Sequence, residues 1–218
     1  LYASNVVYNA ISNQTTYHDT SSGLTNVYVL SVPYSSPYTT VAELASALNG
    51  TSEYLTVSDP TVEGYVTSVG RYDIDTQGFS QSATLSGRGW QNDFSIVPGE
   101  ALMFTVNGAF TFNMVGTYNS DFSFSLTPPS SGGYALISLP PDVAYANASD
   151  LVSSINGSSS GSPLVVVEEW DPDTQGFSTK SYTYSSRGWS GDFVLDPYYG
   201  QLIKITAGAS VSGWIPSR

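Results

Sequence analysis

Apolar residues recur along this chain in short runs, most of them with a period of two. Residues 122–126 alternate Phe or Leu with Ser, residues 181–185 alternate Tyr with Ser or Thr, and residues 164–167 are four consecutive aliphatic residues. Alternation predicts half-buried strands, and the aliphatic run predicts a fully buried one. Gly, Pro, Asn and Asp separate these runs, which is typical of many short strands joined by turns.

Two segments show helical spacing instead. Thr40 and Glu43 have the spacing of a capping box, apolar residues follow on one face, and Gly50 is placed to end the helix. The second segment repeats this pattern, with Asn147 as the predicted N-cap and Gly157 as the predicted stop. Each apolar stripe can cover only one edge or end of a sheet.

A hairpin is also predicted. Asn107-Gly108 lies between the apolar segments 101–106 and 109–115, and this dipeptide is typical of a two-residue hairpin turn. Ala207-Gly208 takes the same place later in the chain.

The chain repeats itself, and this self-similarity is its strongest signal. The two copies share an apolar strand that ends in proline, a capped helix, an Asp-rich turn and an Arg-Gly-Trp loop. The matched positions are 30–33 with 137–140, 42–50 with 149–157, 73–79 with 171–177, 88–90 with 187–189, Pro98 with Pro197, and Leu102 with Leu202. The offset falls from about 107 to about 98, which places an insertion in copy one near residues 51–70.

These patterns predict a mainly all-β fold of two tandem β-sandwich-like domains, each with one short helix. Copy one spans residues 24–116 and copy two spans residues 132–218. Residues 1–23 are an N-terminal extension outside the repeat that offers a donor strand, and residues 117–131 hold a strand and a Pro/Ser/Gly link.

The composition narrows the function. Only 11% of the 218 residues are charged, the formal net charge is -12, and Cys is absent. An acidic surface argues against nucleic acid and anionic lipid as partners, and no apolar run approaches the length of about 20 residues that a membrane span needs. The chain begins at Leu1 without an initiator Met, so we expect a processed, exported protein. Four sequons suit an extracellular glycoprotein with N-linked glycans at Asn13, Asn49, Asn147 and Asn156.

The Asp-x-Asp-Thr-Gln-Gly motif, present twice, has two interpretations. It resembles part of a calcium loop, with Asp73, Asp75, Asp171 and Asp173 as the candidate ligands. Asp and Gly are also turn formers, and no Glu follows at the distance that a full calcium loop needs. We favour a hairpin turn and no cofactor, with Ca²⁺ as the alternative.

The Arg-Gly-Trp loops have two interpretations as well. Trp90 and Trp189 could form a sugar-stacking platform together with the arginine that precedes each Gly-Trp pair. We favour instead an Arg–Asp ion pair that pins the loop, with Arg88 and Arg187 stacked on an aromatic ring.

Catalytic residues are not evident. The only histidine, His18, lies in a polar stretch outside the repeat, and no Ser-His-Asp arrangement can be assembled around it. Glu168 and Glu169 are neighbours on a predicted strand, so their side chains point to opposite faces and do not form a carboxylate dyad. We therefore expect that the protein is not an enzyme.

Residues 134–140, the short helix that follows them, the aromatic-Asp-x-x-Thr segment at 170–174 and the segment from Asp192 to Leu202 together resemble a repeat module of secreted and cell-surface proteins of bacteria and archaea. That resemblance covers most of both copies and implies a β-rich surface module without catalytic residues. The composition and the N-terminal segment are also similar to archaeal-type pilus and thread subunits. Those subunits are Cys-free, glycosylated and joined by a donated N-terminal strand.

Both likenesses favour a structural subunit of an extracellular filament or surface layer that self-assembles into a homopolymer. The expected contact is the strand-like run 6–11, with either Val7 and Ile11 or the opposite set Val6, Tyr8 and Ala10 as its anchors, because the sequence does not give the register. The alternative is a carbohydrate-binding or adhesive module of a larger surface protein.

Overall fold

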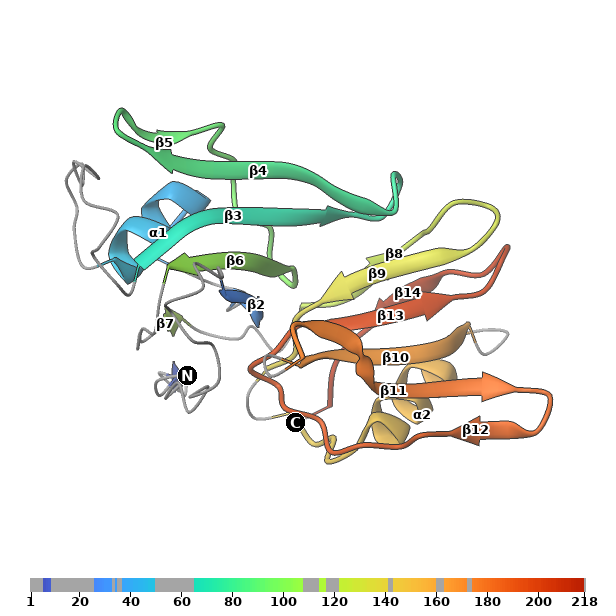
Figure 1. Cartoon of the computed structure of the whole chain (residues 1–218). Helices are drawn as coiled ribbons and strands as arrows, with labels where there is room; N and C mark the ends of the chain where they lie inside the picture. The colour runs from blue at the N-terminus through green and yellow to red at the C-terminus, as the bar shows by residue number, and fades with distance from the viewer. Residues whose placement is uncertain are drawn as a thin grey trace.

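The computed structural model consists mainly of antiparallel strands (Figure 1). It describes residues 6–8, 26–32, 34, 37–49, 65–107, 114–116, 122–140, 143–159, 163–171 and 174–217. The strands in these residues form two five-stranded sheets and two two-stranded pairings. The predicted mainly β fold class is therefore confirmed.

The first sheet belongs to copy one and has the strand order β2-β6-β3-β4-β5. Helix α1 (Val41–Leu48) follows β2 along the chain and lies against β3. The strands are β2 (Asn26–Ser31), β3 (Tyr65–Asp73), β4 (Gly78–Ser86), β5 (Gly89–Gln91) and β6 (Ala101–Asn107).

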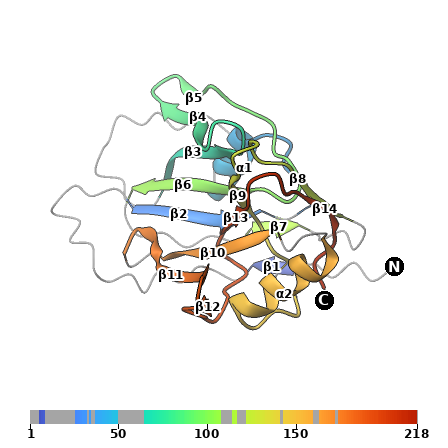
Figure 2. The ribbon, with the colours of Figure 1, turned by 90° about the vertical axis from the view of Figure 1, so that its right-hand side faces the viewer.

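The second sheet belongs to copy two and has the order β9-β13-β10-β11-β12, which is the same order once the strands are matched along the chain. Helix α2 (Ala148–Ser158) lies against β10, as α1 lies against β3. Figure 2 shows α1 behind β3 in the upper half of the molecule and α2 at its lower edge. The strands are β9 (Gly133–Ile137), β10 (Leu164–Asp171), β11 (Gly176–Ser185), β12 (Gly188–Ser190) and β13 (Gln201–Ile205).

Four short strands remain outside the two sheets. β1 (Val6–Tyr8) pairs with β7 (Met114–Gly116), and β8 (Phe124–Leu126) pairs with β14 (Val211–Trp214). The strand predicted within residues 117–131 is thus confirmed as β8.

The helices begin as predicted but do not both end as predicted. Thr40 and Glu43 form a capping box at α1, and the Asp150 carboxylate accepts the backbone N–H of Asn147 at 3.0 Å at the start of α2. The stop predicted at Gly157 is wrong, because α2 continues through Gly157 to Ser158. A glycine inside a helix costs only about 1 kcal/mol, so it does not by itself end one.

The predicted hairpin around Asn107-Gly108 is not formed among the described residues. β6 pairs with β2 on one side and β3 on the other, so both of its edges are already occupied. β7 pairs with β1 instead. The same holds in copy two, where β13 lies between β9 and β10 and β14 pairs with β8.

The strand register corrects one match between the copies. Leu102 lies opposite Leu30 on β2, whereas Gln201 lies opposite Ile137 on β9. Leu30 and Ile137 are matched residues, so Gln201 is the structural counterpart of Leu102, and the predicted match with Leu202 is wrong by one residue. Leu102 and Leu202 were matched because both are leucine, but the equivalent buried position of copy two holds the polar residue Gln201.

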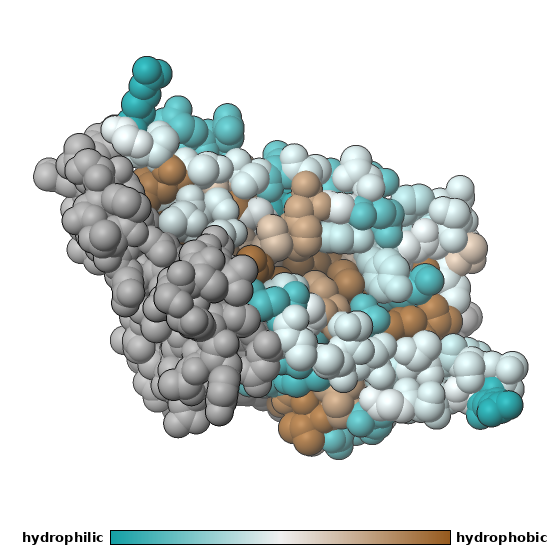
Figure 3. Space-filling view, in the orientation of Figure 1, coloured by the Kyte–Doolittle hydropathy of each residue, from teal (hydrophilic) through white to brown (hydrophobic). Residues whose placement is uncertain are grey.

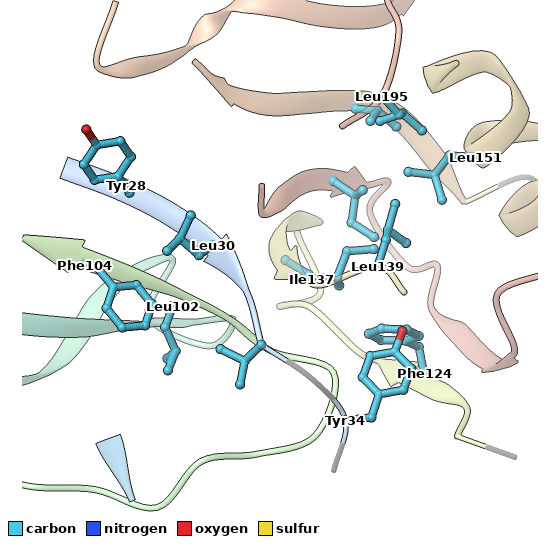
Figure 4. Close-up of a cluster of buried hydrophobic side chains, with 14 of the residues drawn as sticks. Tyr28, Leu30, Tyr34, Leu102, Phe104, Phe124, Ile137, Leu139, Leu151 and Leu195 are labelled. Atoms are coloured by element: carbon cyan, nitrogen blue, oxygen red, sulfur yellow. The ribbon is translucent and has the colours of Figure 1, made fainter. Parts of the chain in front are cut away.

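The hydrophobic core is continuous through both copies. Buried residues of the first sheet, such as Leu30 and Phe104, belong to one cluster with buried residues of copy two, such as Ile137 and Leu151. Figure 4 shows them in one packed region. The presence of two separate sandwich domains is therefore not confirmed, because the repeats share a core.

Candidate functional site

Each repeat has a leading strand that precedes its sheet in the sequence. β1 comes before β2 and pairs with β7, the strand after β6; β8 comes before β9 and pairs with β14, the strand after β13. The two leading strands therefore hold equivalent topological positions. The structural repeat is wider than the repeat seen in the sequence, since β1 of the N-terminal extension is the counterpart of β8.

In copy two the leading strand is part of the core. Phe124 of β8 is only 4% exposed and lies 5.1 Å, between ring centroids, from Trp214 of β14. Phe122 lies 4.5 Å from Tyr34 of copy one. Gly99 makes room for this contact, because a Cβ there would lie 2.5 Å from the Phe122 ring.

In copy one, the backbone of the leading strand is held within the same chain. Val6, Val7 and Tyr8, three of the predicted interface residues, form β1 and lie opposite Gly116, Val115 and Met114 in that order. The other two predicted anchors, Ala10 and Ile11, lie outside the described residues.

The Asp-rich motif in copy one is a self-contained turn. Asp73 accepts the backbone N–H groups of Asp75 at 2.8 Å and Thr76 at 3.1 Å, and the Ser80 hydroxyl at 3.0 Å. These hydrogen bonds, led by the one from Thr76, lower the pKa of Asp73. The predicted hairpin turn is therefore confirmed for this copy, and the Ca²⁺ alternative stays a prediction.

In copy two, Asp171 accepts a hydrogen bond from the Thr179 hydroxyl at 2.5 Å, and Asp173 lies outside the described residues. No group of three or more His, Cys, Asp or Glu residues in the described part of the chain could hold a metal ion.

Each of these turns reaches across to the other copy through its glutamine. Gln77 accepts the backbone N–H of Tyr134 at 2.6 Å and donates to the Tyr134 carbonyl at 3.0 Å. Gln175 accepts the backbone N–H of Val27 at 2.6 Å, and Nε1 of Trp170 donates to the Val27 carbonyl at 3.0 Å. Val27 and Tyr134 are matched residues on β2 and β9, the outermost strands of their sheets.

The glutamines were not singled out from the sequence. A glutamine amide carries a donor and an acceptor, so it can satisfy an edge strand as a peptide group would. Gln77 and Gln175 also share a left-handed backbone, with φ of 57° and 54°. The available signal was the retention of the same polar residue at the same turn position in both copies.

Backbone contacts follow the same reciprocal pattern. The N–H of Ser31 donates to the Tyr198 carbonyl at 3.0 Å, and the N–H of Ser138 donates to the Gly99 carbonyl at 2.9 Å. Ser31 matches Ser138, and Tyr198 matches Gly99. The same backbone hydrogen bond is therefore made twice between the repeats, once in each direction.

The matched residues Arg71 and Glu169 carry opposite charges, and each forms an ion pair with a partner at a different position of its sheet. In copy one, Arg71 of β3 pairs with Glu100 at 2.6 Å. In copy two the matched strand residue is Glu169, which is fully buried and pairs with Lys180 of β11 at 2.5 Å. Glu169 also accepts Nε2 of Gln201 at 2.9 Å. Burial raises the pKa of Glu169 despite these partners.

Glu168 and Glu169 do not form a dyad. Glu168 accepts the Ser181 hydroxyl at 3.3 Å, whereas Glu169 bonds Lys180 and Gln201, and the two carboxylates share no hydrogen-bond partner among the described residues. Burial also raises the pKa of Glu168.

The predicted Arg–Asp ion pairs are wrong. Arg88 and Arg187 are exposed, and neither makes a salt bridge within the described residues. The aspartates cap the helices instead. Asp93 accepts the backbone N–H of Ala42 at 2.9 Å, while Asp192 accepts the backbone N–H of Ser149 at 2.9 Å and its hydroxyl at 2.6 Å. We attribute the recurrence of Asp in both loops to this capping role.

The two candidate sugar-platform residues have different surroundings. Trp90 is partly buried and packs against the core without an aromatic partner among the described residues. Trp189 stacks on Tyr182 with ring centroids 4.7 Å apart and lies 5.4 Å from Tyr184, which is 54% exposed. Copy two therefore has the larger aromatic cluster.

The sequon residues at the helix ends have bonded side chains. Asn49 accepts the backbone N–H of Val66 at 2.7 Å and donates to its carbonyl at 3.1 Å. Asn156 bonds the matched residue Leu164 in the same way, at 2.9 and 3.5 Å. Each amide thus secures the start of the next strand. Glycan occupancy stays a prediction.

Asn147 is the N-cap residue of α2, whereas Asn13 and His18 lie outside the described residues. No helix within the described ranges is long and apolar enough to cross a membrane. Comparison of the chain with protein families, curated proteins and solved structures finds no match.

Proposed function

We propose that this chain is a structural subunit of an extracellular filament or surface layer, assembled by exchange of the leading strand β1 between neighbours. In the polymer, β1 of one subunit pairs with β7 of the next. The observation that carries the proposal is the separate β1–β7 pairing, which lies outside both five-stranded sheets. Breaking it and remaking it between chains leaves every sheet strand in place.

The lengths of the connecting segments favour β1 over β8 as the exchanged strand. Residues 9–25, 17 in number, connect β1 to β2, and they can span at most roughly 55 Å at about 3.3 Å per residue. Residues 127–132, six in number, connect β8 to β9 and can span only about 20 Å. The longer segment gives β1 the reach to pair with a neighbouring subunit.

The surface suits a packed polymer. Only 11% of the residues are charged, and on the coloured part of the face in Figure 3 residues of intermediate hydropathy predominate, with hydrophilic and hydrophobic patches among them. Neighbouring subunits with few charges desolvate little charge when they pack. A head-to-tail contact that does not close on itself produces a fibre.

Deletion of residues 1–12 tests the proposal. We expect the truncated chain to keep its two five-stranded sheets, shown by an unchanged far-ultraviolet circular dichroism spectrum, and to form no fibres in electron micrographs. The control for chain length is a full-length variant in which Val6, Val7 and Tyr8 are changed to Thr. Regular fibres from the truncated chain would exclude strand exchange.

A carbohydrate-binding module is the second candidate. The observation that favours it is the cluster of Tyr182, Tyr184 and Trp189 in copy two, in which Tyr184 is 54% exposed. Exposed aromatic rings can stack on sugar rings. Glycan-array binding that is lost in Tyr184→Ala but kept in Phe79→Ala, a change at an exposed aromatic of copy one, would support this function over the first.

A further inference from the structure

Three side chains of copy two form one row across its sheet. Lys180 of β11 and Gln201 of β13 lie directly opposite Glu169 of β10, one on each side, so the three side chains share one face of the sheet. The Glu169 carboxylate bridges the other two, because Oε1 accepts Nζ of Lys180 at 2.5 Å and Oε2 accepts Nε2 of Gln201 at 2.9 Å. An amine and an amide are therefore held on the two oxygens of one carboxylate.

We propose that this row is a covalent modification site, at which Lys180 and Gln201 join in an intramolecular isopeptide bond with Glu169 as the proton carrier. The bond ties β11 to β13 across β10 and closes residues 180–201 into a ring. The ion pair between Lys180 and Glu169 belongs to the chain before the bond forms. This inference does not depend on polymer formation by β1.

The reaction needs no co-reactant. Nζ of Lys180 passes one proton to Glu169, and the resulting neutral amine attacks Cδ of Gln201. Glu169 gives its proton to Nε2 and takes a second proton from Nζ, the Cδ–Nε2 bond breaks, and ammonia leaves. The new Nζ–Cδ bond is an amide like the one that is lost, so nothing is oxidised or reduced.

Burial favours these steps. Glu169 and Gln201 are both fully buried, and burial raises the pKa of the Glu169 carboxyl, which helps it to take a proton from its neighbour. Little water reaches the Gln201 amide, so the amine has little competition for Cδ. The folded sheet also holds both reacting groups on one carboxylate, which removes most of the entropic cost of bringing them together.

Gln201 is an unfavourable residue for packing alone. Its Oε1 is buried and has no hydrogen-bond partner among the described residues, and an unpaired buried polar atom lowers stability. Copy one has Leu102 at the matched place, so the sheet forms without an amide there. A glutamine that reacts with Lys180 gives this buried amide a purpose that packing does not.

The matched row of copy one lacks the reacting groups. In that row, Gln81 and Leu102 lie opposite Arg71, so it has an amide at one end but neither a primary amine nor a carboxylate. Amine, carboxylate and amide therefore occur together in copy two, as three groups that act as a unit require. The bond is expected in copy two alone.

Mass spectrometry of the folded chain, produced without glycosylation, tests the proposal. The intact mass should be lower than that of the sequence by one ammonia molecule. Loss of ammonia at an Asn-Gly pair gives the same mass, so a tryptic digest locates the bond. Trypsin does not cleave after an acylated lysine, so residues 89–187 and 188–204 should appear as one branched peptide. An intact mass equal to that of the sequence, or a digest in which 188–204 is a free peptide, would overturn the proposal.

Substitutions separate the bond from the ion pair. Lys180→Arg keeps a positive charge beside Glu169 but removes the reactive amine, so this variant should keep its ammonia. Glu169→Gln should keep it as well, because the proton carrier is gone. The control is Lys204→Arg, which changes the other lysine of the chain, at 5.2 Å from the centroid of the Tyr134 ring, and should react like the unaltered chain.

Two results would contradict these assignments: a branched peptide that persists in Lys180→Arg, or one that is lost in Lys204→Arg. The digest of the unaltered chain decides the proposal even if Glu169→Gln fails to fold.

Discussion

Copy one and copy two have the same strand order, but residues at matched positions differ in charge and polarity. Where copy one has a basic residue on its third strand, Arg71, copy two has the acidic residue Glu169. Where copy one has Leu102 opposite its first strand, copy two has Gln201. The topology is therefore set by the placement of strands and turns, and the buried polar groups differ between the copies. Nε2 of Gln201 donates to Glu169, whereas its Oε1 has no hydrogen-bond partner among the described residues.

The leading strands give the second contrast. β8 is built into the core through Phe124 and is followed by a six-residue connection, whereas β1 forms a separate pairing and is followed by a long one. β8 stays paired with β14 of its own chain. We propose that β1 can instead exchange its β7 partner for that of a neighbouring subunit.

Phe124→Ala should have the largest effect. Removing a buried aromatic side chain leaves a cavity and costs about 3–5 kcal/mol, and this ring packs on Trp214 and Phe122. Chemical denaturation would measure the loss. The control is deletion of residues 1–12, which should destabilise the chain less, because β1 lies outside both sheets. An equal loss from the two changes would remove the contrast between the leading strands.

Breaking the charged pair in copy two should cost more than breaking the one in copy one. Lys180→Met leaves the fully buried Glu169 without its cation, which costs about 3–5 kcal/mol, although the donors from Asp196 and Gln201 remain. Arg71→Met leaves Glu100 with the backbone N–H of Val97 as a donor, and the side chain of Glu100 is 12% exposed, so water can solvate its charge. The free energies of unfolding of both variants test this order, and a larger loss in Arg71→Met would reverse our interpretation.

The helix-capping aspartates should show a smaller difference. Asp192 accepts two hydrogen bonds from Ser149, whereas Asp93 accepts one from Ala42, which has no hydroxyl. Removal of a helix cap costs about 1 kcal/mol. The loss of stability in Asp192→Ala should therefore exceed the loss in Asp93→Ala by a fraction of that amount. Thermal melts of the two variants measure it. Equal melts would mean that the hydroxyl contact adds nothing.

The smallest expected effect is a pH dependence of opposite sign at two carboxylates. Burial raises the folded-state pKa of Glu169 above 4.5, so the folded protein binds that proton more tightly, and stability relative to Glu169→Gln should rise as the pH falls from neutral toward 4.5. Hydrogen bonds from Thr39 and Thr40 lower the pKa of Glu43, so stability relative to Glu43→Gln should fall as the pH drops below 4.5. Parallel pH profiles for the two variants would refute these assignments.

Much of the fold follows from local pattern. The capping box at Thr40, the strand at residues 124–126 and the Asp-rich hairpin turn were predictable, because each depends on residues near one another in the sequence. The partner of β6 was not, because it depends on which distant strand occupies each of its edges. The common core also depends on packing between copies, which repetition within the sequence does not reveal.

The sites were less predictable, for a related reason. Arg88 and Asp93 lie close in sequence, which suggested an ion pair, but Asp93 is placed at the start of α1 and bonds Ala42 there. Gln77 carries a contact between repeats, yet in the sequence it is a polar residue in a turn, and only the position of β9 shows what it meets. Residues that act at long range carry little local signal.

A cross-strand disulfide between β1 and β7 tests directly whether β1 is exchanged between subunits. Val7 and Val115 lie directly opposite each other, and opposed residues of an antiparallel pair have Cα atoms about 4.5–5.5 Å apart, within the range that a disulfide spans. The chain has no Cys of its own, so Val7→Cys with Val115→Cys introduces the only thiols, and Val7→Ser with Val115→Ser is the matched control.

Non-reducing electrophoresis of oxidised material then separates the outcomes. Strand exchange predicts a monomer band from dispersed protein and a ladder of disulfide-linked multimers from assembled fibres. Fibres that dissolve to monomers bearing an intrachain disulfide would contradict exchange of β1, even if the chain forms a filament.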